Sequence, residues 1–208
     1  MINNPNMRKY LLAILLFTLS LPAVAQKRWS VIPQAGIQLS RVKCSEDLGQ
    51  KPTYSYRAGA LVEYQFSQGV LGNIGLQSGV MATLKGMGNN NGSREIEAHY
   101  LEIPLLLNWG IHLTSETDLL LKAGPFFAYR FADKSVVYDP LGPVGNTPNP
   151  FYCPYDYGIE CGLGLEYRSL MLNFGANLGL YDFYIDRSAD PNFQMKNQTL
   201  HMSIGCRF

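Results

Sequence analysis

The stretch His99–Leu113, with the sequence HYLEIPLLLNWGIHL, alternates apolar and polar residues along its length. Every second residue from Leu101 to Leu113 is apolar, whereas the positions between them include Glu102, Asn108 and His112. Successive residues of a strand point to opposite faces, so the pattern predicts one long strand with an apolar and a mostly polar face. About ten residues of such alternation are enough to cross a bilayer as a tilted barrel strand.

The same alternation recurs in seven other segments of the chain. They cover residues 30–40, 54–66, 71–84, 118–131, 155–167, 170–181 and 199–208. Long connections, of which 132–154 is the longest, alternate with short turns at 67–69, 114–116 and 168–169. Outer-membrane barrels have this layout, with short periplasmic turns and long extracellular loops. The sequence therefore predicts an all-β fold: an eight-stranded antiparallel up-and-down transmembrane β-barrel with both termini at the periplasmic rim.

Alternation alone does not say which face of the strands is outside, but packing does. The interior of an eight-stranded barrel is barely wide enough for its own side chains. It cannot hold every Leu, Ile, Phe, Tyr and Trp of these strands, so the bulky apolar face is expected to contact lipid. Aromatic residues near the strand ends would then meet the lipid headgroups. They are Tyr64, Phe66, Trp109, Tyr129, Phe131, Tyr157, Tyr167 and Phe208.

The N-terminal segment resembles a secretory signal peptide. Arg8 and Lys9 precede the apolar run Tyr10–Leu21, and Ala23-Val24-Ala25 forms a small-x-small cleavage site. We therefore expect a signal peptide over 1–25 and one barrel domain over 26–208. Removing Arg8 and Lys9 from the 17 Lys and Arg leaves 15 against 16 Asp and Glu, a formal charge of −1. This balance gives no indication of a nucleic-acid partner, and no motif indicates a cofactor.

Charged residues on the polar strand faces are expected to point into the lumen. An isolated charge in a narrow, partly dry lumen is very costly, so each needs an opposite partner. Because the two signs nearly balance, the sequence predicts an ion-pair network that plugs the barrel rather than a selective pore. The predicted members are Arg57, Glu63, Glu102, Lys122, Arg130, Glu160, Glu166 and Arg207, with Arg168 a further candidate.

Residues that could carry other chemistry were weighed individually. His201 and Ser203 share one strand face and form a candidate base–nucleophile pair, but two residues along a strand place their Cα atoms about 6.5 Å apart. Ordinary lumen polar residues are the favoured interpretation. Cys44 and Cys153 fall in predicted loops at one rim and could form a disulfide. Spacing alone does not fix their connectivity, so both the bridged and the free forms are compatible with the sequence. Pro104 cannot donate to a strand ladder, so a bulge or local break is expected there.

Three stretches carry a resemblance to a known family. The strand YLEIPLLLNW (Tyr100–Trp109), the signal peptide and the terminal Ile204–Phe208 resemble the PorT-like outer-membrane β-barrel family of Bacteroidetes-type bacteria. The resemblance implies the fold and an outer-membrane location, and Phe208 looks like the C-terminal signal read by the barrel-assembly machinery. It does not establish the secretion role of the member that gives the family its name.

The favoured functional hypothesis is a non-enzymatic outer-membrane barrel with a plugged lumen. It would lie in outer-membrane lipid and act through its outer loops or in an envelope or secretion assembly with a protein partner. A small porin passing ions or small solutes is the alternative, and a lipid-modifying enzyme using His201 and Ser203 is a third. The candidate contact residues in the long loops are Tyr138, Phe151, Tyr152, Tyr155, Phe183 and Tyr184.

Overall fold

The computed structural model describes residues 28–45, 50–69, 72–89, 94–139, 142–146, 153–182 and 194–208. The predicted signal peptide lies outside these residues. The described part of the chain forms nine strands: β1 (Trp29–Cys44), β2 (Gln50–Gly69), β3 (Gly72–Asn89), β4 (Arg94–His112), β5 (Thr117–Asp139), β6 (Gly142–Asn146), β7 (Tyr155–Tyr167), β8 (Leu170–Gly179) and β9 (Met195–Cys206). No helix in these ranges is long and apolar enough to cross a membrane.

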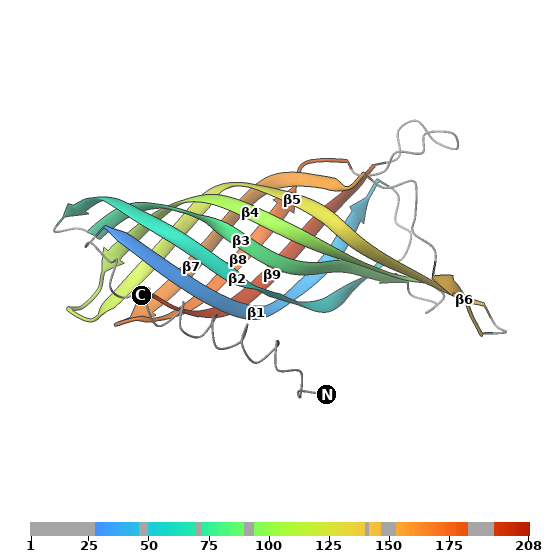
Figure 1. Ribbon diagram of the computed structural model, residues 1–208, viewed down its shortest axis with the longest axis horizontal. Coiled ribbons are helices and arrows are strands. Elements are labelled where there is room, and N and C mark those ends of the chain that lie inside the picture. The colour runs from blue at the N-terminus through green and yellow to red at the C-terminus, as the bar shows by residue number, and fades with distance from the viewer. Residues whose placement is uncertain are drawn as a thin grey trace, which may run out of the picture.

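Eight of these strands close into an antiparallel barrel, as the alternation predicts. Each strand from β1 to β5 pairs with the next, β5 pairs with β7, and β7, β8 and β9 follow in order. The pairing of β9 with β1, through partners such as Leu39 and Leu200, joins the last strand to the first. Figure 1 shows the resulting cylinder, with all strands inclined to its long axis.

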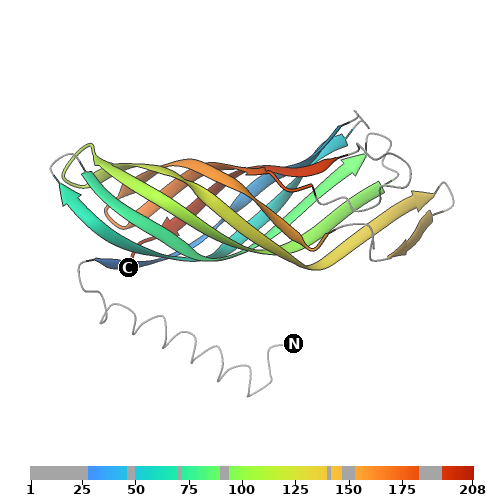
Figure 2. The same ribbon diagram turned by 90° about the horizontal axis from the view of Figure 1, so that it is seen from above.

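The two ends of the barrel differ. Short turns join β2 to β3, β4 to β5 and β7 to β8 at the end where the C-terminus lies (Figure 2). At the other end β5 continues beyond its last β7 partner, Tyr129, and pairs there with β6. The strands β4, β5 and β6 thus project from the barrel as a narrow sheet. The prediction that 132–154 is entirely loop is therefore wrong over its first part, since residues to Asp139 and 142–146 are strand.

Most strands extend further toward this end than the sequence indicated. β3 runs to Asn89, and its last residues pair with the start of β2. Lys85, which directly follows the predicted strand 71–84, is therefore a strand residue. This region is polar and rich in glycine. Because it has no apolar residue at every second position, its sequence did not indicate that the strand continues.

The exposure of the side chains fixes the orientation of the strands. On β4, Leu101, Ile103, Leu105, Leu107 and Trp109 are all exposed, whereas the intervening residues from Glu102 to Gly110 are buried. β7 shows the same strict alternation over its whole length. The apolar faces therefore point outward and the polar faces inward, and the aromatic residues predicted at the strand ends, apart from the half-buried Tyr64, are exposed.

Pro104 interrupts one ladder without shifting its register. It is fully buried on the inward face of β4. The β3–β4 ladder pairs Ser78 with Leu105 and resumes at Met81 and Glu102, with no pair formed at Ile103 and Pro104. Since the alignment is the same on both sides, this is the local break that a missing N–H predicts. The bulge in β4–β5 pairing lies elsewhere, between His99 and Tyr100.

Candidate functional site

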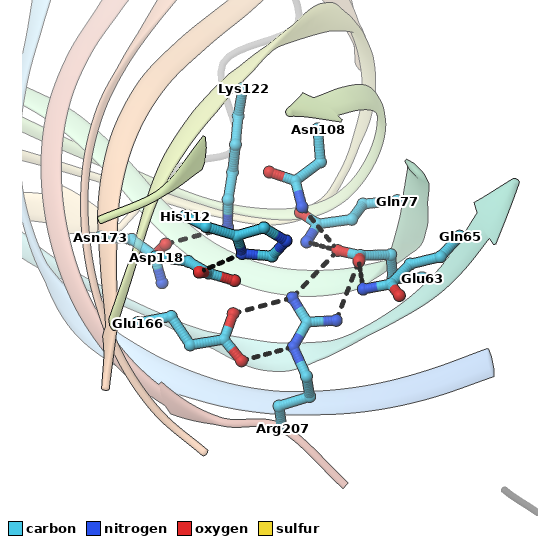
Figure 3. A network of polar contacts seen from close by, with 10 residues as sticks. All are labelled: Glu63, Gln65, Gln77, Asn108, His112, Asp118, Lys122, Glu166, Asn173 and Arg207. Atoms are coloured by element: carbon cyan, nitrogen blue, oxygen red, sulfur yellow. Dashed lines mark hydrogen bonds and ion pairs between the residues drawn. The ribbon is translucent and has the colours of Figure 1, made fainter. Parts of the chain in front are cut away.

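The first layer of the lumen, toward the short-turn end, is organised by Arg207. Its guanidinium lies 2.8 Å from Glu63 through Nη1 and 2.7 Å from Glu166 through Nε. Glu63 comes from β2 and Glu166 from β7, two strands that are not neighbours in the barrel. Figure 3 shows Arg207 between the two carboxylates. This arrangement ties the last residues of the chain to both sides of the lumen.

Amide side chains complete the hydrogen bonding of Glu63, which is almost fully buried. Asn108 donates to its Oε2 at 2.8 Å, Gln65 donates to its Oε1 at 3.0 Å, and Gln77 also donates to Oε2. Beside this group Lys122 donates to Asn173 Oδ1 at 2.9 Å (Figure 3). A buried carboxylate with this many donors is well compensated for its lost hydration.

An apolar layer separates this ionic layer from the next. Along the inward face of β2, Leu61 lies between Glu63 and Arg57. It packs in a buried cluster with residues of four other strands, Ile32, Met81, Leu120 and Met171. The sequence predicted a mostly polar inward face, without an apolar layer. These residues belong to the inward parity of their strands, but isolated apolar residues within a polar pattern gave no clear signal.

The second ionic layer contains charges from four strands. Arg57 of β2 lies 3.5 Å from Glu102 of β4 and 3.6 Å from Glu160 of β7. Lys85 of β3 lies 2.9 Å from Glu102 and 3.3 Å from Asp156 of β7. All of these side chains are buried. Arg57–Glu160 and Lys85–Asp156 join strands that are well separated around the barrel, so these two ion pairs cross the lumen.

Lys85 also packs against aromatic rings. Its Nζ lies 5.1 Å from the centre of the Tyr100 ring and 4.8 Å from that of Phe126. Both rings belong to a buried cluster with Ala98 and Ala128 toward the long-loop end. An ammonium group over aromatic faces gains cation–π attraction in addition to its ion pairs.

His201 and Ser203 do not form a base–nucleophile pair. His201 Nε2 lies 3.5 Å from Glu160 Oε1, whereas Ser203 Oγ is hydrogen-bonded to Gln34 at 3.4 Å. Both residues are buried inside the barrel. His201 occupies space left by a glycine of the adjacent strand, since a Cβ on Gly175 would lie 2.4 Å from its Cε1. The geometry matches lumen residues that fill space and satisfy charge.

The structure places the eight predicted network residues as follows. Six of them form ion pairs: Arg57, Glu63, Glu102, Glu160, Glu166 and Arg207. Lys122 is bonded to an amide, and Arg130 is half-buried in β5, where its backbone N–H donates to Pro154. Arg168 lies outside the lumen, at the short-turn rim, where it pairs with Glu116 at 2.9 Å.

Sequence reasoning missed Lys85 and Asp156 as members of the network. Lys85 follows Thr83 on the inward parity of β3, and Asp156 precedes Gly158 on the inward parity of β7. Extending each alternation by one step would have placed both side chains in the lumen. Lys85 lies one residue beyond the predicted strand 71–84. Asp156 lies inside the predicted strand 155–167, but the predicted network did not include it.

Of the six contact residues predicted at the long-loop end, two lie in strands of the described part of the chain. Tyr155 is an outward strand residue whose ring lies 5.8 Å from Phe127 and 5.5 Å from Tyr129. Tyr138, expected in a loop, lies in β5 opposite Pro143 of β6. The remaining four, Phe151, Tyr152, Phe183 and Tyr184, lie outside the described residues.

The cysteines and histidines carry no metal or disulfide chemistry in the described ranges. Cys44 and Cys153 are both free thiols, so the disulfide left open above is not formed. Tyr181 donates to the Cys153 sulfur at 3.4 Å. Among the residues that the structure describes, no group of three or more His, Cys, Asp and Glu side chains could hold a metal ion.

Comparison with known families agrees with this architecture. The sequence profile of a family described as "Outer membrane protein beta-barrel domain" matches residues 24–184. The chain belongs to this family. Membership places the protein in the bacterial outer membrane. In outer-membrane barrels the short turns are generally periplasmic and the long loops extracellular. No curated protein matches the chain.

Solved structures give the same fold at low sequence identity. The outer membrane enzyme PagL is 10% identical, with a TM-score of 0.51 over 85% of this chain and 98% of its own. OprG from Pseudomonas aeruginosa is 13% identical, with a TM-score of 0.47 over 87% and 96%. Ail of Yersinia pestis, solved with the heparin analogue sucrose octasulfate, is 14% identical, with a TM-score of 0.44 over 87% and 99%. At these identities the likeness concerns the fold alone.

Proposed function

We propose that this protein is a non-enzymatic, non-conducting outer-membrane barrel that acts through the strands and loops at its outer end. The observation that carries the proposal is the pair of ionic layers inside the barrel. Arg207 and Arg57 each bridge carboxylates from strands on different sides, and Lys85 does the same. With an apolar layer between the two ionic layers, the lumen holds side chains where a porin would hold water.

The charge balance of the lumen supports the same proposal. On the inward side of the described strands, five buried or half-buried cations, Arg57, Lys85, Lys122, Arg130 and Arg207, accompany six carboxylates, those of Glu63, Glu102, Asp118, Asp156, Glu160 and Glu166. A selective pore would need an excess of one sign along a wider passage. Here the charges neutralise one another, and a polar hollow of about 170 Å³ remains at the short-turn mouth, bordered by Asp118, Glu166 and Arg207.

The projecting sheet of β4, β5 and β6 is the proposed contact region. It extends from the barrel at the end that faces outward in this family (Figure 2). The partner would be an external molecule or another envelope protein. Export through a signal peptide over 1–25 and insertion by the barrel-assembly machinery through Phe208 are parts of the same proposal.

Planar-bilayer recording tests the plug. Purified full-length protein is expected to give no steady single-channel current. A triple variant, Arg57→Ala with Glu102→Ala and Glu160→Ala, removes one cation together with the two carboxylates that it bridges. It should conduct measurably more current than the wild-type protein. Steady, large currents from the wild-type protein would refute the plugged lumen and favour the porin alternative.

The non-enzymatic part of the proposal needs its own test. His201 and Ser203 are buried and bind different partners, and this supports a structural role. Deletion of the gene should leave the composition of the envelope lipids unchanged. If lipid composition changes and a Ser203→Ala protein fails to restore it, the enzyme alternative is correct.

A further inference from the structure

The outer surface of the barrel carries a basic patch at the long-loop end of β1 and β9. Arg41 and Lys43 are exposed on β1, on the outward parity that also carries Ile37 and Leu39. Lys196 lies on the outward parity of β9, where it is half-buried. The cross-strand register places Arg41 opposite Gln198 and Lys43 opposite Lys196. Three cations thus share one face of two paired strands.

The patch is not neutralised by neighbouring carboxylates in the described parts of the chain. Arg41 binds Gln198 Oε1 through Nε at 3.1 Å and Nη2 at 3.0 Å, and none of the three cations forms an ion pair there. Asp182, at the same end, accepts a hydrogen bond from the backbone N–H of Met195. Like charges directly opposite across two strands are destabilising. The pair of Lys43 and Lys196 therefore favours an anion between or beside the two ammonium groups.

An apolar furrow begins at this patch and crosses the lipid-facing surface. A hollow of about 280 Å³ is bordered by Arg41, Gln198, Leu39 and Leu178. A second hollow, of about 660 Å³, continues over β7 and β5 and reaches Trp109 on β4. The two hollows share Ala176 and Leu200 in their linings.

Small side chains make the floor of the furrow. The ladders place Leu200, Ala176, Cys161 and Ala123 side by side on β9, β8, β7 and β5. The next row toward the short-turn end is bulky, with Trp109, Leu121, Leu163 and Phe174 in register. Three small residues beside a row of large ones leave a shallow channel. It runs across three strands, a length of roughly 14 Å at about 4.8 Å per strand.

We propose that this face binds one phosphorylated lipid of the outer leaflet. Its phosphate lies on Arg41, Lys43 and Lys196, and one acyl chain lies in the furrow over Ala176 and Cys161. Charge complementarity selects the headgroup, because guanidinium and ammonium groups form strong charge-assisted hydrogen bonds with phosphate oxygens. The position of the patch, directly outside the apolar belt at the outward end, matches the level of an outer-leaflet headgroup. This site does not depend on whether the lumen is plugged.

Quenching of Trp109 fluorescence tests the proposal directly. The chain has two tryptophans, so Trp29→Phe leaves Trp109, which borders the furrow, as the only reporter. The full-length Trp29→Phe protein is placed in phosphatidylcholine vesicles that contain either phosphatidic acid or phosphatidylcholine brominated near the ends of its acyl chains. Brominated phosphatidic acid is expected to quench Trp109 at a several-fold lower mole fraction than brominated phosphatidylcholine. Identical quenching curves for the two lipids would overturn the proposal.

Variants separate headgroup binding from general lipid contact. R41Q, K43Q and K196Q together should abolish the preference for phosphatidic acid, whereas K51Q, at an exposed lysine of the same end on β2, should keep it. Ala176→Phe fills the furrow where the hollows meet and should also reduce the quenching. A triple variant that keeps the preference refutes the site. Heat-modified gel mobility confirms that each variant is folded.

Excess inorganic phosphate distinguishes a lipid from a free anion. A preference for brominated phosphatidic acid that survives the added phosphate supports a lipid anchored by both headgroup and chain. Loss of the preference shows that the cations bind the free ion alone, and it overturns the assignment of a lipid to the furrow.

Discussion

Arg207 and Glu63 meet inside the barrel although 144 positions separate them in the sequence, with Nη1 and Oε1 2.8 Å apart. The same guanidinium binds Glu166 through Nε at 2.7 Å and Nη2 at 3.1 Å. Glu63 is 1% exposed and Arg207 16%. One arginine therefore compensates two carboxylates that have little access to water.

Arg207→Met should destabilise the protein strongly, because it leaves two buried carboxylates without a cation. Breaking a buried ion pair from one side costs about 3–5 kcal/mol. The triple variant Arg207→Met, Glu63→Gln, Glu166→Gln removes the charges together and should cost much less. Urea unfolding in detergent micelles, followed by tryptophan fluorescence, measures both. Equal losses of stability in the two variants would mean that the charges themselves are unimportant.

Lys85 and Lys122 form a matched pair of lumen lysines with different surroundings. Lys85 has two carboxylate partners and two aromatic rings, whereas Lys122 donates to an amide oxygen of Asn173. Lys85→Met should therefore cost about 3–5 kcal/mol, the range for breaking a buried pair. Lys122→Met should cost about 1 kcal/mol, as for one hydrogen bond. The same unfolding assay decides, and the reverse order would contradict the assignment of Lys85 to the network.

Gly175 and His201 should be energetically coupled. A Cβ on Gly175 would lie 2.5 Å from His201 Nε2, so Gly175→Ala must displace the imidazole and weaken its contact with Glu160. We expect a loss of about 1–3 kcal/mol, typical of overpacking. In the double variant with His201→Ala the loss should be smaller than the sum of the single losses. Strict additivity in this double-mutant cycle would show that the two residues do not interact.

Cys161 reports the orientation of the strands. It is exposed on the outward face of β7, between the outward residues Ile159 and Leu163. In a variant with Cys161 as the only cysteine, a charged, membrane-impermeant maleimide should not react. A bilayer-soluble maleimide should react only slowly, because maleimide addition needs a thiolate and acyl chains disfavour the charged form. Cys153, which precedes β7 at the long-loop end, serves as the single-cysteine control and should react with both reagents. Labelling of Cys161 by the charged reagent alone would place this face in water.

The period of two predicted which residues share a face of each strand, and the narrow lumen predicted that the apolar face is outside. The strand Tyr155–Tyr167 has the predicted bounds, and the break at Pro104 follows from its missing N–H. Strand length was less predictable. β3 and β5 continue as polar or mixed segments into water, where burial no longer imposes an alternation.

Partners within the lumen could not be read from the alternation. Whether Arg57 meets Glu102 and Glu160 depends on the stagger of strands around the closed barrel, which a linear pattern does not contain. Charge balance predicted that the inward charges pair, but not which residues do so. The apolar layer around Leu61 was missed for a related reason, since its five members come from five separate strands.

The position of Arg207, after the final strand, has a consequence for biogenesis. Glu63 and Glu166 lie on β2 and β7, so neither carboxylate has its arginine partner until the residue after β9 reaches the lumen between them. An incomplete sheet in the bilayer would contain two carboxylates without their arginine partner. Closure of the barrel would remove this electrostatic cost. The pairing of β9 with β1 and the formation of the Arg207 ion pairs are therefore expected to occur together when the barrel closes.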